Sequence, residues 1–466
     1  MIPSRFIILG ASGDLTGRYL LPALARLREC ERIPAELKVL GIARDDWDTA
    51  QFRKHAAERL LQHSSEVAAG TREAIVAALE YRRADVTKPE EIASALGQFK
   101  EPAVFYLALP PALAESALRG LAVARPADGS RVVMEKPFGT DLESARNLNQ
   151  LVHGLFAERM VFRMDHFLGH ETVMNVLGLR FANRIFEPLW NREHVERVEI
   201  TWDETLALEG RAGYYDRAGA LRDMIQNHLL QILCLVAMEP PLGLGERDLR
   251  DRKAELLRSV RKMSVAEAAT RSVRARYGAG RVGERDIPAY VAEPRVEADR
   301  STETFAEVKL EIENWRWAGV PFILRSGKAL AHARREIAVH FRPVPHLLFG
   351  PDDRAIPNVL RVQLSPDRMS LSTNISSRRG EFELDQVSLE TELAKDPLPA
   401  YARLLTDILA GDVTLSIRDD EAEECWRIVQ PVLEAWRENR VPLLEYPAGS
   451  SGPLRADQPA PASLPV

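Results

Sequence analysis

Short apolar runs alternate with helical patterns through the first third of the chain. Each run is apolar at consecutive positions, which is typical of strands buried on both faces of a parallel sheet. Helical patterns lie between the runs, including a long one at residues 50–79. This alternation predicts an α/β domain with a parallel sheet. The predicted strands span residues 6–9, 37–43, 81–86, 103–109, 131–134 and 160–162.

Beyond residue 165 the apolar positions change to a period of two. Such a period indicates strands with one buried face and therefore a mostly antiparallel sheet. The predicted strands lie within residues 198–202, 304–315, 337–341, 360–364 and 369–373. Amphipathic helices at 400–409 and 421–436 are expected to cover this sheet. The pattern predicts domains at 1–165 and 166–457, and a tail at 458–466 whose Pro and Ala content indicates disorder.

Composition excludes several classes of protein. The chain has 466 residues, of which 45% are hydrophobic and 28% charged, as in ordinary globular proteins with two domains. A net charge of -6 argues against a nucleic-acid partner, and no apolar run is long enough to cross a membrane. Cys30, Cys234 and Cys425 form no disulfide or metal-ligand spacing, and the N-terminus has no secretory pattern. We therefore expect a cytoplasmic protein.

A glycine-containing turn follows the first predicted strand. It contains Gly10, Ser12 and Gly13, and Ser12 occupies the second glycine position of the dinucleotide fingerprint G-x-G-x-x-G, so the spacing alone is a weak signal. Its small residues still let the backbone approach a pyrophosphate at the N-terminus of a helix. The turn therefore predicts a dinucleotide site, and a glycine turn without a ligand is the alternative.

Arg44 follows the second predicted strand. At this place an acidic residue binds the ribose of NAD, whereas an arginine accommodates the 2′-phosphate of NADP. Asp45 and Asp46 come directly afterwards and weaken the preference. We expect NADP as the cofactor, with NAD as the alternative.

Two polar groups of residues follow later strands. Asp165, His166 and His170 lie between the strand at 160–162 and a helical pattern, and Lys136 follows the strand at 131–134. Open α/β sheets bind ligands at the carboxyl ends of their strands. These residues are therefore candidates for a binding site, and a solvated loop and a surface lysine are the alternatives.

A helical pattern at 221–235 carries Asp223 and His228. Residues five apart are about 140° apart on a regular α-helix. The two side chains reach one ligand only if Asp223 lies at the start of the helix or the helix is distorted, and both arrangements stay open at this point. A structural histidine bonded to the backbone is the alternative for His228.

Together these motifs resemble those of the glucose-6-phosphate dehydrogenase family, from Ile7 to about Asp457. The resemblance implies a Rossmann domain followed by an α+β domain with a large, mostly antiparallel sheet. It also implies a homodimer or homotetramer built through that sheet. The segments that carry it are residues 10–15, 22–24, 135–139, 165–169, 179–183, 209–214, 222–228, 237–241 and 320–328.

The resemblance implies a reaction and a set of site residues. The reaction is the NADP-dependent oxidation of glucose 6-phosphate at C1 to 6-phosphoglucono-1,5-lactone, which begins the oxidative pentose phosphate pathway. His228 would be the general base and Asp165 the carboxylate that orients it, and imidazole suits this task because its pKa lies near working pH. The implied substrate residues are His166, His170, Glu204, Asp223, Lys136, Lys328 and Arg334. The implied cofactor residues are Gly10, Ser12, Gly13, Asp14, Leu15, Arg44, Asp85, Val86 and Lys136.

The chain departs from the family at its phosphate-binding motif. The family has Asp-His-Tyr-Leu-Gly-Lys, whereas this chain has Phe167 and His170 in place of the tyrosine and the lysine. A charge-assisted hydrogen bond is worth on the order of 1.5–3 kcal/mol, so the changes would weaken phosphate binding. Ala333 also replaces a later basic residue, and Arg334 and Arg335 follow it. Either these arginines restore the anion site, or the substrate differs at C6.

Three other hypotheses stay open. One is a 1-dehydrogenase of a different hexose, unphosphorylated or otherwise substituted. Another is a non-catalytic regulatory paralogue, against which the intact Asp165, His228 and Lys136 argue. The third is a metal site at His166 and His170, which are four residues apart, although Gly169 between them weakens the helix that it needs. We expect no metal.

Overall fold

The first strand of the chain, β1 (Arg5–Leu9), lies inside a six-stranded sheet in the computed structural model. The structure describes residues 3–97, 101–169, 171–210, 212–349, 356–364, 367–377, 383–392 and 398–454. They form two compact units. Unit 1 comprises Met1–Glu171, Pro241–Ala254 and Asp396–Glu424, and unit 2 comprises Thr172–Pro240, Glu255–Lys395 and Cys425–Val466.

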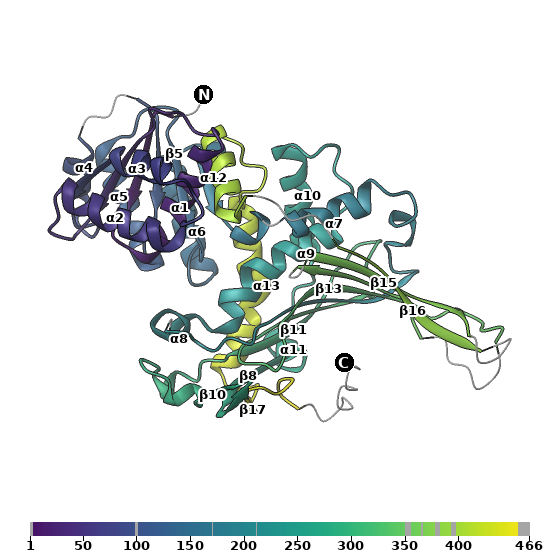
Figure 1. The fold of residues 1–466 in the computed structure, drawn as a ribbon. Helices are drawn as coiled ribbons and strands as arrows, with labels where there is room; N and C mark the ends of the chain where they lie inside the picture. Colours follow the sequence, from purple (N-terminus) through teal and green to yellow (C-terminus); the bar gives the residue numbers. More distant parts are fainter. Residues whose placement is uncertain are drawn as a thin grey trace. The chain divides into compact units, whose positions relative to one another are not determined.

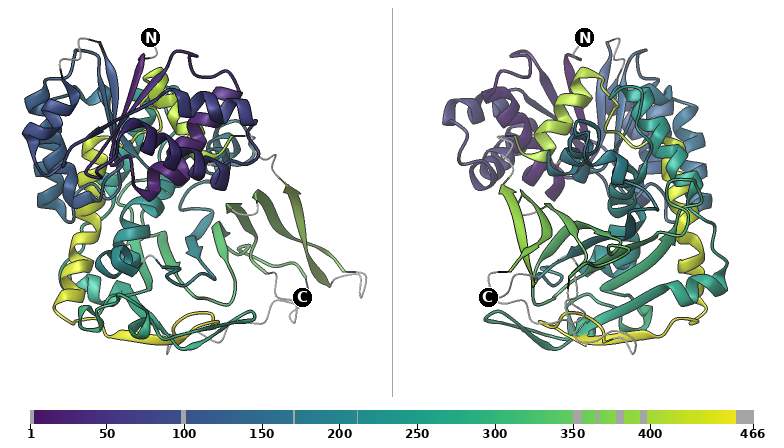
Figure 2. Two further views of the ribbon diagram at one scale, coloured as in Figure 1. Left: turned by 60° about the vertical axis from the view of Figure 1, so that its left-hand side comes forward. Right: turned by 90° about the vertical axis from the view of Figure 1, so that its right-hand side faces the viewer.

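The sheet of unit 1 has the strand order β3-β2-β1-β4-β5-β6, with every neighbouring pair parallel. This is the order of a Rossmann domain, and it confirms the α/β prediction. The last four residues of β1 and all residues of β4 are buried because helices cover both faces of the sheet (Figures 1 and 2). The other strands are β2 (Lys38–Ala43), β3 (Leu79–Arg83), β4 (Ala103–Leu107), β5 (Arg131–Glu135) and β6 (Val161–Met164).

The helical pattern predicted at 50–79 is two helices followed by the start of β3. The break between them lies at residues 64–68, where Ser64 donates its hydroxyl hydrogen to the carbonyl of Leu60 and ends the first helix. The helices of unit 1 are α1 (Leu21–Glu29), α2 (Thr49–His63), α3 (Ala69–Ala77), α4 (Pro89–Leu96), α5 (Ala114–Ala124), α6 (Leu142–His153) and α12 (Ala400–Ala410).

Helix α12 corrects one expectation. The amphipathic pattern at 400–409 is a helix, but its apolar face does not cover the antiparallel sheet. Leu404, Leu405 and Ile408 belong to the same buried cluster as Phe6 of β1 and Leu24 of α1. Figure 1 shows α12 in yellow-green beside the purple helices of unit 1. The expectation was wrong because an amphipathic pattern identifies a buried face but not the surface that buries it.

Buried charges attach the two returning segments of the chain to unit 1. Glu158 accepts hydrogen bonds from Arg163 of β6 at 2.8 Å and from Arg250 at 2.9 Å. Lys253 and Glu421 form an ion pair at 2.8 Å whose side chains are 1% and 0% exposed. Two helices, α10 (Glu246–Ser259) and α13 (Asp419–Arg437), carry these partners. A pair so fully buried is sensitive to the loss of either partner, because the remaining charge would have no counter-ion.

Unit 2 is built on a nine-stranded sheet with the order β16-β15-β14-β13-β7-β12-β11-β8-β17. Neighbouring strands are antiparallel except for β7 with β12 and β8 with β17, which confirms the predicted mostly antiparallel sheet. Figure 2 shows β17, in yellow, at one edge of this sheet. The strands are β7 (Val195–Asp203), β8 (Ser272–Gly278), β11 (Phe305–Glu311), β12 (Pro321–Gly327), β13 (Arg334–Phe341), β14 (Val359–Leu364), β15 (Asp367–Ser376), β16 (Leu384–Glu392) and β17 (Leu443–Pro447).

The helices of unit 2 include an unusual one. Residues Leu221–Leu229 form the π-helix η6, between α8 (Ala212–Ala220) and α9 (Leu230–Ala237). The unit also contains α7 (Glu171–Phe181), α11 (Val265–Arg271) and a small hairpin of β9 (Gly280–Val282) and β10 (Arg285–Ile287). No helix within the described ranges is long and apolar enough to cross a bilayer.

Candidate active site

The glycine turn lies between β1 and the short π-helix η1 (Thr16–Leu20). Gly10 has a φ of +92°, and a Cβ atom there would lie 2.2 Å from the carbonyl oxygen of Ala108. The turn therefore requires glycine both for its conformation and for space. It brings the backbone close to the N-terminus of a helix, where unpaired N–H groups bind phosphate. The local geometry fits a dinucleotide pyrophosphate.

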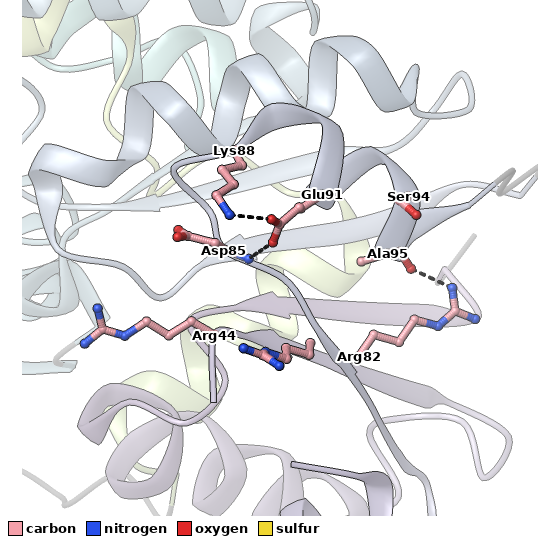
Figure 3. A pocket seen from close by; sticks show the side chains of 8 residues that line it. Arg44, Arg82, Asp85, Lys88, Glu91, Ser94 and Ala95 are labelled. Atoms are coloured by element: carbon pink, nitrogen blue, oxygen red, sulfur yellow. Dashed lines mark hydrogen bonds and ion pairs between the residues drawn. The ribbon is translucent and has the colours of Figure 1, made fainter. Parts of the chain in front are cut away.

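Arg44 lines a cavity of about 710 Å³ beyond the carboxyl ends of β2 and β3 (Figure 3). Four cationic side chains and two carboxylates line it, so the cavity favours an anion. Lys88 donates a hydrogen bond to Glu91 at 2.7 Å, and Arg82 donates one to the carbonyl of Ala95 at 2.5 Å. The lining residues are Arg44, Arg82, Arg83, Asp85, Lys88, Glu91, Ser94 and Ala95.

Within the described part of the chain, Arg44 forms no ion pair, whereas the carboxylates that follow it are engaged. Ser12 donates its hydroxyl hydrogen to Asp45 at 2.5 Å, and Arg83 pairs with Asp46 at 2.9 Å. The hydroxyl of Tyr81 donates to the carbonyl oxygen of Asp45 at 2.8 Å and fixes its backbone. Burial raises the pKa of Tyr81 to about 12, so this hydroxyl keeps its proton near neutral pH. The Arg44 guanidinium is thus available to a phosphate.

Glu135 ends β5 directly before Lys136, and two tyrosines hold it. Tyr106 of β4 donates a hydrogen bond to Glu135 Oε1, and Tyr401 of α12 donates to the same oxygen at 3.3 Å. Burial raises the pKa of Glu135 to about 7, although both hydrogen bonds and the nearby Lys136 act in the opposite direction. The carboxyl group therefore titrates near neutral pH, next to a lysine that the sequence places in the site.

Asp165 follows β6 and is fully buried. Its Oδ1 accepts the backbone N–H of Phe167 at 2.9 Å, which caps the turn η4 (His166–Gly169). The ring of His166 stacks on Tyr401 at 6.0 Å, and Tyr401 stacks on Tyr19 at 5.0 Å. The Asp165 carboxylate and the ring of Tyr401 thus both support the turn that carries His166. His170 lies outside the described residues.

Unit 2 brings Glu204 and Lys328 together at the ends of two parallel neighbours, β7 and β12. Lys328 Nζ lies 2.6 Å from Glu204 Oε2 and 5.1 Å from the ring centre of Tyr215. Arg335 Nη2 lies 3.8 Å from Glu204 Oε1. The oxygens of a carboxylate at this position can accept hydrogen bonds from sugar hydroxyl groups.

Arg334 lies near a different carboxylate from the one that its neighbour Arg335 approaches. Its Nε is 3.7 Å from Asp203, which also binds Arg325 at 2.9 Å. Consecutive residues of a strand point to opposite faces of the sheet, which separates the two arginines. Arg335 is therefore the arginine that the structure places at Glu204.

The π-helical hydrogen bonding of η6 determines how the side chains of Asp223 and His228 are oriented relative to each other. The N–H of Leu230 bonds to the carbonyl of Ile225, five residues back, as the π-helical pattern requires. Because such a helix has roughly 4.4 residues per turn, residues five apart are roughly 50° apart rather than 140°. Asp223 and His228 thus share one face. The helix is distorted and Asp223 also lies in its first turn, so both arrangements left open by the sequence are present. The Tyr214 hydroxyl also donates to Asp223 at 3.3 Å.

Sequence reasoning missed several residues that support these groups. Tyr401 is 266 positions from Glu135 in the chain, and a tyrosine in an amphipathic helix carries no signal of such a contact. Tyr215 was next to a recognised motif, but only the fold shows that its ring meets Lys328. Glu135 offered one signal, a carboxylate directly after the three apolar residues of β5.

Comparison with known proteins covers both units. The family model "Glucose-6-phosphate dehydrogenase, NAD binding domain" matches residues 7–175, and "Glucose-6-phosphate dehydrogenase, C-terminal domain" matches residues 177–462. The chain is similar to the glucose-6-phosphate 1-dehydrogenase of Treponema pallidum, with 40% identity over 99% of this chain and 94% of the relative.

Two solved structures resemble the chain over nearly its whole length. Glucose-6-phosphate 1-dehydrogenase from Mycobacterium avium has a TM-score of 0.85 and 37% identity, covering 97% of this chain and 96% of that one. A glucose-6-phosphate dehydrogenase in complex with its substrate glucose 6-phosphate has a TM-score of 0.86 and 30% identity, covering 96% of this chain and 95% of that one.

Replacement of the Glu135 carboxyl group should remove a pH dependence of stability. The folded protein holds a proton on Glu135 up to about pH 7, whereas in the unfolded chain the same carboxyl, with its ordinary pKa of 4.5, has already lost it. The contribution of Glu135 to the free energy of unfolding therefore falls as pH rises from about 4.5 through 7. We expect Glu135→Gln to gain thermal stability relative to the wild type as pH rises, measured as the melting-temperature difference from pH 5 to 8.

The exposed Glu66 provides the control. Glu66→Gln should differ from the wild type by the same small amount at each pH. A melting-temperature difference for Glu135→Gln that does not change with pH would contradict the titration of Glu135 near neutrality.

Proposed function

The chain belongs to the glucose-6-phosphate dehydrogenase family, and from this we propose that it oxidises glucose 6-phosphate at C1 with NADP. The C1 hydroxyl loses its proton, a hydride passes from C1 to the cofactor, and the products are 6-phosphoglucono-1,5-lactone, NADPH and a proton. The observation that carries the proposal is the full-length match to glucose-6-phosphate dehydrogenases, one of which was solved with glucose 6-phosphate bound.

Unit 1 would hold the cofactor. The turn at Gly10, Ser12, Gly13, Asp14 and Leu15 suits the pyrophosphate because Gly10 leaves no room for a side chain. Arg44 and its cationic cavity suit the 2′-phosphate, and Asp85 and Val86 follow the neighbouring strand β3. When bound, the nicotinamide supplies the hydride acceptor. Lys136, after β5, would contact both cofactor and sugar.

His228 is proposed as the general base, with Asp165 as the carboxylate that orients it. His228 is 1% exposed, so few water molecules compete for its ring nitrogen. Asp165 is also fully buried and keeps one oxygen on the backbone of Phe167, which fixes the direction of its carboxylate. A buried carboxylate stabilises the imidazolium that forms when the base takes a proton.

The sugar would be bound by groups of unit 2 and by the turn after β6. Asp223, on the same face of η6 as His228, and Glu204, paired with Lys328, would accept hydrogen bonds from sugar hydroxyl groups. His166 and His170 would bind the phosphate. Of Arg334 and Arg335, the position of Arg335 beside Glu204 favours it as a further cation for the substrate.

The domain roles and the assembly are part of the proposal. Residues 1–165 would bind the cofactor, and residues 166–457 would bind the sugar and form the oligomer. A homodimer or homotetramer built through the nine-stranded sheet is supported by Ile375 and Leu389, which are 48% and 62% exposed on its outer strands. The reaction would take place in the cytoplasm, in keeping with three cysteines that are all free.

The substrate can be tested by comparing glucose 6-phosphate with glucose. Each charge-assisted hydrogen bond to a phosphate is worth about 1.5–3 kcal/mol. Two such bonds should therefore make kcat/KM for glucose 6-phosphate at least about a hundred-fold higher than kcat/KM for glucose. We expect this preference in steady-state assays with NADP. A ratio near one would instead favour the dehydrogenase of an unphosphorylated hexose.

Loss of the base should abolish most turnover. We expect His228→Asn to lower kcat by about 10²–10⁴-fold with a small change in KM, because general-base catalysis contributes in that range. The exposed His194 of the same unit supplies the control, and His194→Asn should have wild-type kinetics. Unchanged turnover of His228→Asn would contradict this role and show that a different group is the base.

Cofactor preference should depend on Arg44. We expect Arg44→Ala to lower kcat/KM for NADP by about 10–100-fold, the value of one charge-assisted hydrogen bond, and to leave kcat/KM for NAD nearly unchanged. Arg119→Ala, on the exposed surface of α5, is the matched control. Equal losses with both cofactors would show that Arg44 does not bind the 2′-phosphate.

A further inference from the structure

The buried residue Glu303 contacts the helix that carries Asp223 and His228. Its Oε1 accepts the backbone N–H of Leu221, the first residue of η6, at 3.0 Å. The side chain is buried, with 7% of its surface exposed. An N–H in the first turn of a helix has no partner within the helix, so Glu303 supplies one from outside. The position of its carboxyl group is one where the positive end of the helix dipole favours a negative charge.

The backbone before η6 has no side chain at the place where the Glu303 carboxylate lies. Gly219 joins α8 to η6 with φ +70° and ψ 171°, a conformation that is essentially restricted to glycine. A Cβ at Gly219 would lie 2.3 Å from Glu303 Oε1. Because residue 219 has no side chain, the Glu303 carboxylate can reach the start of η6 without a clash.

The segment around Glu303 also fixes the other sugar-binding groups. Thr302 donates its hydroxyl hydrogen to the carbonyl of Asp216 in α8 at 2.6 Å. The carbonyl of Glu303 accepts the N–H of Ala220 at 3.2 Å, and that of Thr304 accepts the N–H of Lys328 at 3.0 Å. Consecutive residues of one segment thus hold α8, η6 and the backbone of Lys328. Glu303 is the only one of them whose side chain reaches η6 among the described contacts.

We propose that Glu303 is a positioning residue for the reaction: its carboxylate sets the start of η6 and thereby places Asp223 and His228 relative to Glu204 and Lys328. The inference rests on the proposed roles of these residues. A shift of about 1 Å in a group that must meet a reacting atom can lower the rate a hundred-fold. A residue that never touches the sugar can therefore control turnover.

The surroundings of Glu303 are consistent with a cap rather than an acid or base for the substrate. Burial raises its pKa, while the backbone N–H of Leu221 and the guanidinium groups of Arg222 and Arg274 act in the opposite direction. The hydrogen bonds described for its carboxylate are to backbone N–H groups. Glutamine has the same length and keeps an oxygen that can accept the N–H of Leu221, whereas aspartate is too short to reach it and alanine has no acceptor.

The test compares Glu303→Gln, Glu303→Asp and Glu303→Ala in the full-length protein, with glucose 6-phosphate and NADP. Glu303→Ala and Glu303→Asp should lower kcat by about 10–100-fold and change the KM for the sugar, while the KM for NADP stays within about two-fold. Glu303→Gln should recover most of the lost kcat. Glu284→Ala, on the exposed turn between β9 and β10, controls for the loss of a carboxylate in this unit.

The melting temperature of each variant is measured first, and the kinetic assays are run well below it. A lower kcat then reports on the positioning of side chains and not on unfolding. Wild-type kcat in both folded variants, Glu303→Asp and Glu303→Ala, would overturn the proposal, as would equal kcat values for Glu303→Gln and Glu303→Asp. If Glu303→Ala does not fold, the comparison of glutamine with aspartate decides.

His228→Asn measured alongside separates the role of the base from the role of its support. A fully active His228→Asn would overturn the proposed base. An inactive His228→Asn with wild-type kinetics in the Glu303 variants would overturn only the positioning role.

Discussion

The hydrogen-bond register of η6 is the constraint on which the proposed chemistry depends. In a regular α-helix Asp223 and His228 would point in widely different directions, and one ligand could not meet both. The shift from four-residue to five-residue hydrogen bonds turns them to a common face. Such a helix is less favourable than an α-helix and needs support from its surroundings. Here the support comes from the bend at Gly219 and from the carboxylate of Glu303 at the first N–H.

Hydrogen bonds to buried carboxylates also support the local structure in unit 1, where buried charged and polar groups lie at the ends of strands. Asp165 caps the turn of His166, and Glu135 is held by hydroxyl groups from β4 and α12. Burying such groups is costly unless each is bonded, and the bonds fix their direction. A site built this way is ordered before its ligands bind, because the supporting side chains cannot rotate without leaving a buried polar atom unpaired.

Local pattern was sufficient for the strands of unit 1, the class of both domains and the carboxyl-edge position of Gly10, Arg44, Lys136 and Asp165. It did not predict β8, β16 and β17 of unit 2. Parallel strands end at one edge, so residues that follow them are neighbours even when the chain separates them widely. The sequence could not locate α12, because its apolar face fits either unit. It also left the Asp223 and His228 geometry open, since helical periodicity does not distinguish α from π hydrogen bonding over nine residues. Glu303 had no signal in the sequence, because the positioning role proposed for it depends on a contact with a residue 82 positions away.

The most direct test of the proposed chemistry is a crystal structure of the protein with glucose 6-phosphate bound. We expect a ring nitrogen of His228 to lie about 2.6–3.2 Å from the C1 oxygen of the sugar, with the Asp165 carboxylate on the other ring nitrogen. Asp223 should contact a hydroxyl of the same sugar. A bound sugar whose C1 oxygen is out of reach of His228, or meets another base, would contradict the central claim.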